Sequence, residues 1–142
     1  MVLGAASALA EATLRVLAPA GPSLLLVGRN GPRLDTIADD LRVRGAKEVA
    51  CFIADLADPK CHGEVLDVAK RTLGEIDVAL VAYGTLGSQA ACEASFEETE
   101  RELTTNFLSV VSFGTLLANE FEARRAGCLV VISSVAGDRT RR

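Results

Sequence analysis

The chain has 142 residues, enough for one domain with a sizeable core, and 49% of them are hydrophobic. It carries 15 basic and 19 acidic residues, a formal net charge of −4. This balance argues against a nucleic-acid-binding protein, whose binding face is usually basic. No apolar run in the sequence reaches the length of a membrane-spanning helix.

The first half of the chain alternates apolar runs with segments of helical character. Leu34, Ile37 and Leu41 repeat at helical spacing, with a proline in the first turn of their helix and Gly45 after its end. An earlier segment is rich in alanine and leucine, which are good helix formers. We predict strands at 1–3, 23–27 and 49–54, and helices at 8–18 and 32–44.

The second half continues the same alternation. Asp58 and Pro59 open a helix that Gly74 ends. A long helical pattern then precedes Gly127, which is typical of a helix C-terminus. We predict a helix from 58 to 73, a strand at 77–82, a helix at 96–125 and a strand at 128–132.

The predicted strands are almost entirely apolar, without alternation of polar residues. Strands of this kind are buried on both faces, as in parallel sheets covered by helices. Strand-helix-strand units with right-handed crossovers build a doubly wound sheet. We therefore predict an α/β, Rossmann-type domain over residues 1–142, with a parallel sheet in the strand order 3-2-1-4-5.

The four cysteines and the single histidine predict neither disulfides nor a metal site. Cys51 and Cys128 fall in apolar strands, which indicates buried free thiols in a reducing compartment. Cys61 and His62 are adjacent, and adjacent residues on a helix point away from each other. The N-terminus has no basic segment of a signal peptide, so we expect a cytoplasmic protein.

Small residues join the first strand to the first helix. Gly4, Ser7 and the alanines between and after them leave room for the backbone to approach a pyrophosphate at the helix N-terminus. The alternative is a tight turn before an alanine-rich helix packed on the sheet. The ends of the next two strands favour dinucleotide binding.

The second strand ends at Gly28 and Arg29, without an acidic residue. An acidic residue there binds the ribose 2′-hydroxyl of NAD, whereas arginine accommodates the 2′-phosphate of NADP. The third strand ends at Asp55 and Leu56, which we place at the adenine. We therefore predict NADP(H) as the preferred cofactor, with NAD(H) as the alternative.

With these features the sequence resembles the short-chain dehydrogenase/reductase family. Residues 4–10 are similar to the family motif TGxxxGxG, although Leu3 replaces its threonine. Residues 55–56 match its Asp-Val/Leu pair, and residues 81–84 are loosely similar to its Asn-Asn-Ala-Gly motif. The order and spacing of these motifs make the set more specific than any one of them.

The same resemblance implies the catalytic residues. Asn106 matches the family's helix asparagine, and Ser134, directly before Val-Ala-Gly, matches its catalytic serine. The family transfers hydride between a nicotinamide and a carbonyl or alcohol carbon of a small molecule. Ser134 would bind the substrate oxygen, and Asn106 would hold a proton-relay water. The implied cofactor-binding residues are Gly4, Ser7, Ala8, Leu9, Arg29, Asp55, Leu56, Ala82 and Gly84.

The chain departs from the family pattern at both ends. The family's catalytic tyrosine follows the serine by about a dozen residues, with a lysine four residues later. Eight residues follow Ser134, and none is tyrosine or lysine. Three residues precede Gly4. We therefore expect a domain truncated at both ends and a chain inactive by itself. We also expect the full-length protein to form homo-oligomers.

Two segments, 76–87 and 133–142, resemble within this family the reductase subunit of the decaprenylphosphoryl-ribose 2-epimerase system, which reduces a keto sugar. Arg29 departs from that subunit, which is associated with NADH.

Two other interpretations of the chain remain: a non-catalytic dinucleotide-binding module, and a fragment that does not fold stably. We interpret one acidic run as charges at a helix start, namely Glu97, Glu98, Glu100 and Glu102.

Overall fold

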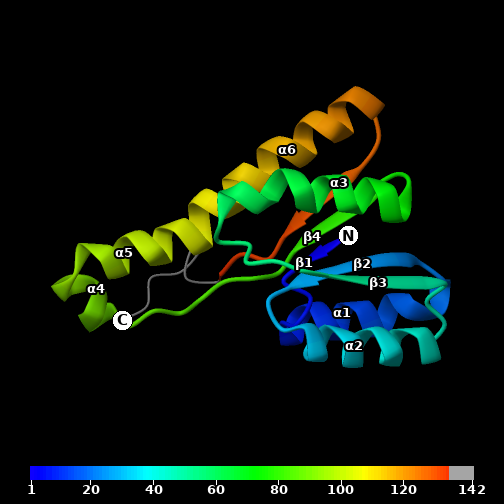
Figure 1. Cartoon of the computed structure of the whole chain (residues 1–142), viewed down its shortest axis with the longest axis horizontal. Helices are drawn as coiled ribbons and strands as arrows, with labels where there is room; N and C mark the ends of the chain where they lie inside the picture. The colour runs from blue at the N-terminus through cyan, green and yellow to red at the C-terminus, as the bar shows by residue number, and fades with distance from the viewer. Residues whose placement is uncertain (135–142) are drawn as a thin grey trace.

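The computed structural model describes residues 1–134, which form one parallel sheet covered by helices (Figure 1). The strand order is β3-β2-β1-β4-β5, so the predicted topology of a Rossmann-type doubly wound sheet is confirmed. Every neighbouring pair is parallel. The strands are β1 (Val2–Leu3), β2 (Ser23–Gly28), β3 (Glu48–Ile53), β4 (Val78–Val81) and β5 (Cys128–Val131).

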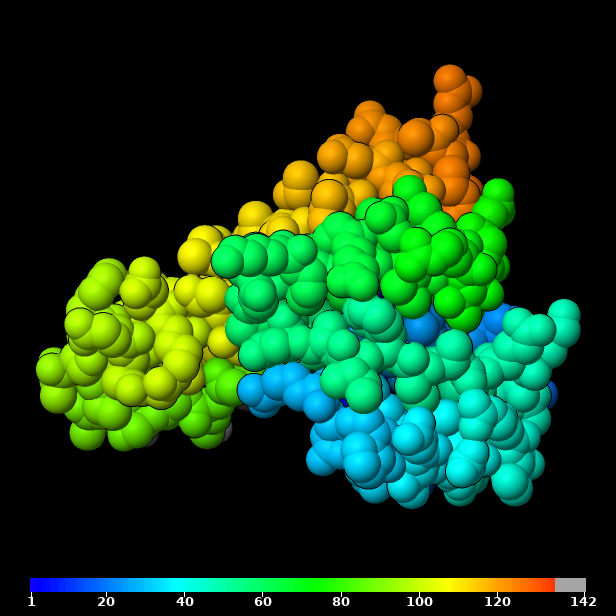
Figure 2. All heavy atoms as spheres, viewed as in Figure 1, coloured from blue at the N-terminus to red at the C-terminus, as the bar shows by residue number. Residues whose placement is uncertain are grey.

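Helices cover both faces of the sheet. In Figure 1 the pair α1 and α2 lies on one side, and α3 and α6 lie on the other. The pair α4 and α5 projects beyond the sheet, as Figure 2 also shows. The helices are α1 (Ala8–Leu17), α2 (Gly31–Val43), α3 (His62–Leu73), α4 (Gln89–Ala94), α5 (Phe96–Leu103) and α6 (Ser109–Arg124). Short 3₁₀ turns span Ala18–Ala20 and Pro59–Cys61.

The helical pattern predicted from 96 to 125 is divided into three parts. A π-helical segment, Thr104–Leu108, joins α5 to α6. The i→i+5 bonds of such a segment shift the side chains that follow relative to a regular helix, and π-segments often occur at functional sites. Helix α4 was not predicted, because its six residues are too few to show a helical repeat.

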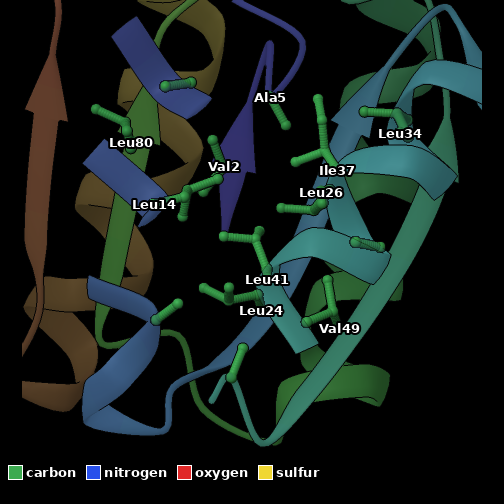
Figure 3. Close-up of a cluster of buried hydrophobic side chains, with 14 of the residues drawn as sticks. Val2, Ala5, Leu14, Leu24, Leu26, Leu34, Ile37, Leu41, Val49 and Leu80 are labelled. Carbon is green, nitrogen blue, oxygen red and sulfur yellow. The ribbon is translucent and has the colours of Figure 1, made fainter. Parts of the chain in front are cut away.

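Two hydrophobic clusters, one on each face of the sheet, fix the strands. Adjacent residues of a strand point to opposite faces, so Val2 and Leu26 join the cluster against α1 and α2, whereas Leu3 and Leu25 join the cluster against α3 and α6. Figure 3 shows the first cluster, with Leu14 of α1 near the strands. Burial on both faces is thus confirmed for β1 and β2.

The prediction of burial on both faces is wrong for β5. Val130 is 41% exposed and Val131 is 44% exposed. Cys128 is also exposed, so the buried thiol predicted there is wrong as well. Within residues 1–134, β5 is hydrogen-bonded only to β4 and lies at the edge of the sheet. The physical reason, which hydropathy does not reveal, is that among the described residues β5 is paired on one side only and that, of its residues, only Leu129 packs against a hydrophobic cluster.

Residues 1–134 contain no helix that is both long and apolar enough to cross a lipid bilayer. The longest helix in this part of the chain, α6, has 16 residues and carries Glu120, Glu122 and Arg124.

Candidate functional site

A cleft of about 360 Å³ opens at the carboxyl ends of β1 to β4. The strands are parallel, so the segments that follow them gather at one edge of the sheet, where α/β proteins bind ligands. The lining residues are Gly4, Ala6 and Ser7 after β1, Gly28 and Arg29 at the end of β2, Ala54 to Ala57 after β3, Ala82 to Thr85 after β4, and Arg101, Glu102 and Thr105 from α5 and the π-segment.

The turn after β1 is held by its backbone. The N–H groups of Gly4 and Ala5 both donate to the Val27 carbonyl, at 2.9 and 3.1 Å. Gly4 has a φ of +80°, and a Cβ there would lie 2.5 Å from the Cβ of Tyr83. Both the conformation and the space therefore require glycine at this position.

Helix α1 begins directly beside the cleft. The Ser7 hydroxyl accepts a hydrogen bond from the Ala10 N–H at 3.1 Å and caps the helix. The positive end of the α1 dipole thus meets a turn made of small residues, an arrangement that suits an anion such as pyrophosphate. Ala10 is fully buried, so this helix packs closely on the sheet.

The ends of β2 and β3 add one cation and one carboxylate. Arg29 lines the cleft, is exposed, and forms no ion pair with any residue from 1 to 134. The Asp55 carboxylate accepts a hydrogen bond from the Ala57 N–H at 3.1 Å, which tightens the turn after β3. Leu56 is buried beside them.

His62 is a core residue that supports this wall of the cleft. Its Nε2 lies 3.0 Å from the Leu56 carbonyl oxygen, and its Nδ1 lies 2.8 Å from the Ser112 hydroxyl of α6. A carbonyl only accepts, so Nε2 carries the proton. The ring also contacts Phe113, with centroids 3.9 Å apart. His62 thus joins α3 to α6 through Nδ1 and the ring, and joins α3 to the segment after β3 through Nε2.

The loop after β4 is held by side chains. The hydroxyl of Ser109 donates to the Thr105 carbonyl at 2.7 Å, so the Tyr83 hydroxyl, 2.8 Å from Ser109, is the donor in that pair. Burial raises the pKa of the Tyr83 phenol. Tyr83 thus remains a neutral phenol at neutral pH.

Asn106 is paired with the main chain of Thr85. Its Oδ1 accepts from the Thr85 N–H at 2.8 Å, and its Nδ2 donates to the Thr85 carbonyl at 3.1 Å. The Glu102 carboxylate, one turn earlier, accepts from the same Asn106 amide at 3.1 Å. The side chain of Asn106 therefore holds the loop, while its role toward a proton-relay water stays a prediction.

The structure gathers most of the predicted site residues in the cleft. Ala8 and Leu9 are exposed in the first turn of α1 and do not line it. Ser134 is exposed after β5, and the Val-Ala-Gly turn that follows lies outside the described residues. The predicted residues that line the cleft are Gly4, Ser7, Arg29, Asp55, Leu56, Ala82 and Gly84.

Among the lining residues that the sequence did not predict as site residues are Tyr83, Thr85 and Glu102. Glu102 was interpreted as part of an acidic helix start, but α5 begins at Phe96, so Glu102 lies in its last turn. The spacing of Glu102 and Asn106, four residues apart in a helical pattern, was the available signal. Their common contact with Thr85 depends on the tertiary structure.

Comparison with known proteins decides the family. The sequence matches the short chain dehydrogenase family over residues 1–142. The chain belongs to this family. An uncharacterized oxidoreductase of Streptomyces coelicolor is 36% identical to this short-chain dehydrogenase chain over 143 residues, which cover 100% of the chain and 56% of that protein. An uncharacterized oxidoreductase of Mycobacterium tuberculosis is 34% identical over 142 residues, covering 100% and 57%.

Solved structures of short-chain dehydrogenases share the fold. An NAD⁺-bound xylitol dehydrogenase matches with a TM-score of 0.89 and 22% identity, covering 99% of this chain and 54% of its own. An NADPH-bound actinorhodin polyketide ketoreductase variant matches with a TM-score of 0.87 and 22% identity, with the same coverage. The short-chain dehydrogenase chain described here thus spans about half the length of the proteins it matches.

Proposed function

We propose that this chain binds NADP(H) and belongs to an oxidoreductase that transfers hydride between the nicotinamide and a carbonyl or alcohol carbon. The observation that carries the proposal is the cleft itself. It combines the Gly4 turn, the N-terminus of α1 and the ends of β2 and β3 at one edge of a doubly wound sheet. Membership of the short-chain dehydrogenase family supports the same chemistry.

The cofactor would lie across the carboxyl ends of the strands. Gly4 and Ser7 would hold the pyrophosphate at the start of α1, and Asp55 and Leu56 would flank the adenine. When bound, the nicotinamide supplies or accepts the hydride. Ser134 would donate a hydrogen bond to the substrate oxygen, where charge develops during the reaction.

Arg29 supports NADP(H) over NAD(H). It lies at the end of β2, where the ribose 2′ position of a bound dinucleotide is recognised, and its guanidinium suits a phosphate. Gly28, the other residue at this position, carries no acidic group to bind a 2′-hydroxyl. The related solved structures contain NAD⁺ in one case and NADPH in the other, so this preference rests on Arg29.

Arg29→Asp tests the function and the preference together. We expect the wild-type chain to bind NADPH more tightly than NADH, and the variant to lose about 1–3 kcal/mol for NADPH while gaining for NADH. The dissociation constants of both dinucleotides measure this. Arg71→Asp, on the exposed surface of α3, is the control for the change in net charge. Equal losses for both dinucleotides in Arg29→Asp contradict the assigned role.

We further propose that residues 1–142 alone bind dinucleotide without turnover. Protonation of the substrate oxygen needs a positioned acid. The only tyrosine of the chain, Tyr83, donates a hydrogen bond to Ser109 and is not placed to serve as that acid. Oxidation of NADPH in the presence of a panel of ketones and keto sugars tests this. Turnover that survives Tyr83→Phe and disappears in Ser134→Ala overturns the proposal.

A further inference from the structure

The loop 83–88 runs alongside α5 and the start of α6 (Figure 1). Every second residue of the loop is hydrogen-bonded to a side chain of α5, the π-segment or α6. The intervening Leu86 is 92% exposed. The helical partners of the bonded residues are Glu102, Asn106 and Ser109, spaced four and then three residues apart, so these three side chains lie on one face. The three rungs are Tyr83 with Ser109, Thr85 with Asn106, and Gly87 with Glu102.

One carboxylate oxygen of Glu102 makes most of the contacts at the far end. Oε2 accepts hydrogen bonds from the Thr85 hydroxyl at 2.8 Å, the Gly87 N–H at 3.1 Å and the Asn106 amide at 3.1 Å. Hydrogen bonds to a charged acceptor are stronger than those between neutral groups. Glu102 therefore joins the loop to Asn106 through a single atom.

The loop backbone at Gly87 approaches the Glu102 side chain closely because residue 87 has no Cβ. A Cβ at this position would lie 2.7 Å from Cδ of Glu102. Two other acidic side chains of α5 bind elsewhere: Glu98 pairs with Arg101, and Glu97 accepts from the Ser95 hydroxyl. The loop contact thus belongs to Glu102 and not to these neighbours.

We propose that Glu102 is a positioning residue for the nicotinamide half of the dinucleotide. This rests on the proposed function. The adenosine half is recognised at the ends of β2 and β3, so the rest of the dinucleotide must extend past the Gly4 turn toward the end of β4. Thr85 and Glu102 line the cleft on that side. By fixing the loop against the helix, Glu102 sets the shape of this half of the cleft.

The test compares the full dinucleotide with ADP, which lacks the nicotinamide half. In Glu102→Ala we expect NADPH to bind about tenfold more weakly, the effect of losing a hydrogen bond to a charged group, with ADP binding unchanged. Glu102→Gln keeps an oxygen acceptor and should recover most of the NADPH affinity. Glu100→Ala, an exposed change of the same kind on α5, should bind both ligands as the wild type does.

Equal weakening of NADPH and ADP in Glu102→Ala shows general destabilisation and overturns the inference, as does unchanged NADPH affinity. A wild-type chain that binds neither NADPH nor NADH instead refutes the proposed function and, with it, the role toward nicotinamide. Amide exchange in the unliganded chain reports the loop contact separately. Exchange at Thr85 and Gly87 should accelerate in Glu102→Ala but not in Glu100→Ala, and equal exchange in both overturns the loop contact.

Discussion

Two loops form adjacent walls of the cleft, and they are held in different ways. The turn after β1 is fixed by backbone N–H groups that donate to Val27, and it has no space for a side chain at Gly4. The loop 83–88 is fixed by hydrogen bonds that it donates to side chains of α5, the π-segment and α6. A change in the first wall must therefore disturb the sheet itself, whereas a change in the second removes one contact at a time.

Gly4→Ala should produce the largest effect. The new Cβ would meet the Cβ, N and Cα atoms of Tyr83 at 2.5 to 2.9 Å, and alanine is strained at a φ of +80°. We expect a loss of about 2–4 kcal/mol in the free energy of unfolding, together with loss of dinucleotide binding. Urea unfolding and dinucleotide titration measure these two effects.

Gly63→Ala is the matched control for that substitution. Gly63 lies in α3, and a Cβ added there would meet nothing within 4 Å in the described residues apart from its chain neighbours and its own helix backbone, and would adopt no unusual backbone conformation. Alanine in a helix is more favourable than glycine by about 0.5–1 kcal/mol, so this variant should equal or exceed the wild type in stability. A similar loss of stability in both variants contradicts the requirement for glycine at position 4.

His62→Phe should have the next largest effect, because His62 is the side chain that supports the part of the cleft formed after β3, at Leu56. Phenylalanine preserves the ring contact with Phe113 but leaves the Leu56 carbonyl and the Ser112 hydroxyl without their partner. We expect a loss of about 1–3 kcal/mol in the free energy of unfolding. Ser112→Ala removes only one of the two contacts and should cost less. The reverse order would show that Leu56 does not depend on His62.

Tyr83→Phe should have the smallest effect on stability, about 1 kcal/mol, because it removes a single hydrogen bond from the second wall. The chain has one tyrosine and no tryptophan, so ultraviolet absorbance reports the ionisation of Tyr83 alone. Its pKa should lie above the ordinary value of 10.0, because burial disfavours the phenolate. A titration midpoint at or below 10.0 would show that the phenol is not buried against Ser109.

The same pKa shift predicts how stability depends on pH. The folded chain binds the Tyr83 phenol proton more tightly than the unfolded chain does. The contribution of this group to the free energy of unfolding is therefore fully present below pH 10.0 and is lost as pH rises through the folded pKa. Tyr83→Phe should lack this alkaline loss. Unfolding of both proteins by urea across this pH range provides the comparison.

The order of strands and the positions of the cleft residues near β1 to β3 were predictable from sequence. Gly4, Arg29 and Asp55 each directly follow or end an apolar run, and parallel strands bring their carboxyl ends to one edge. The exposure of β5 was not predictable from its hydropathy. An edge strand and a central strand can have the same apolar composition, and only pairing distinguishes them.

The sequence by itself determined the alternation of strands and helices, the glycine turn and the family, because these depend on periodicity and on residues close together in the chain. Only the tertiary structure decided what holds the second wall. Glu102 lies 15 residues from Gly87, and Ser109 lies 26 residues from Tyr83. The π-segment and the packing of α6 on the sheet bring these partners together, and no local pattern encodes that geometry.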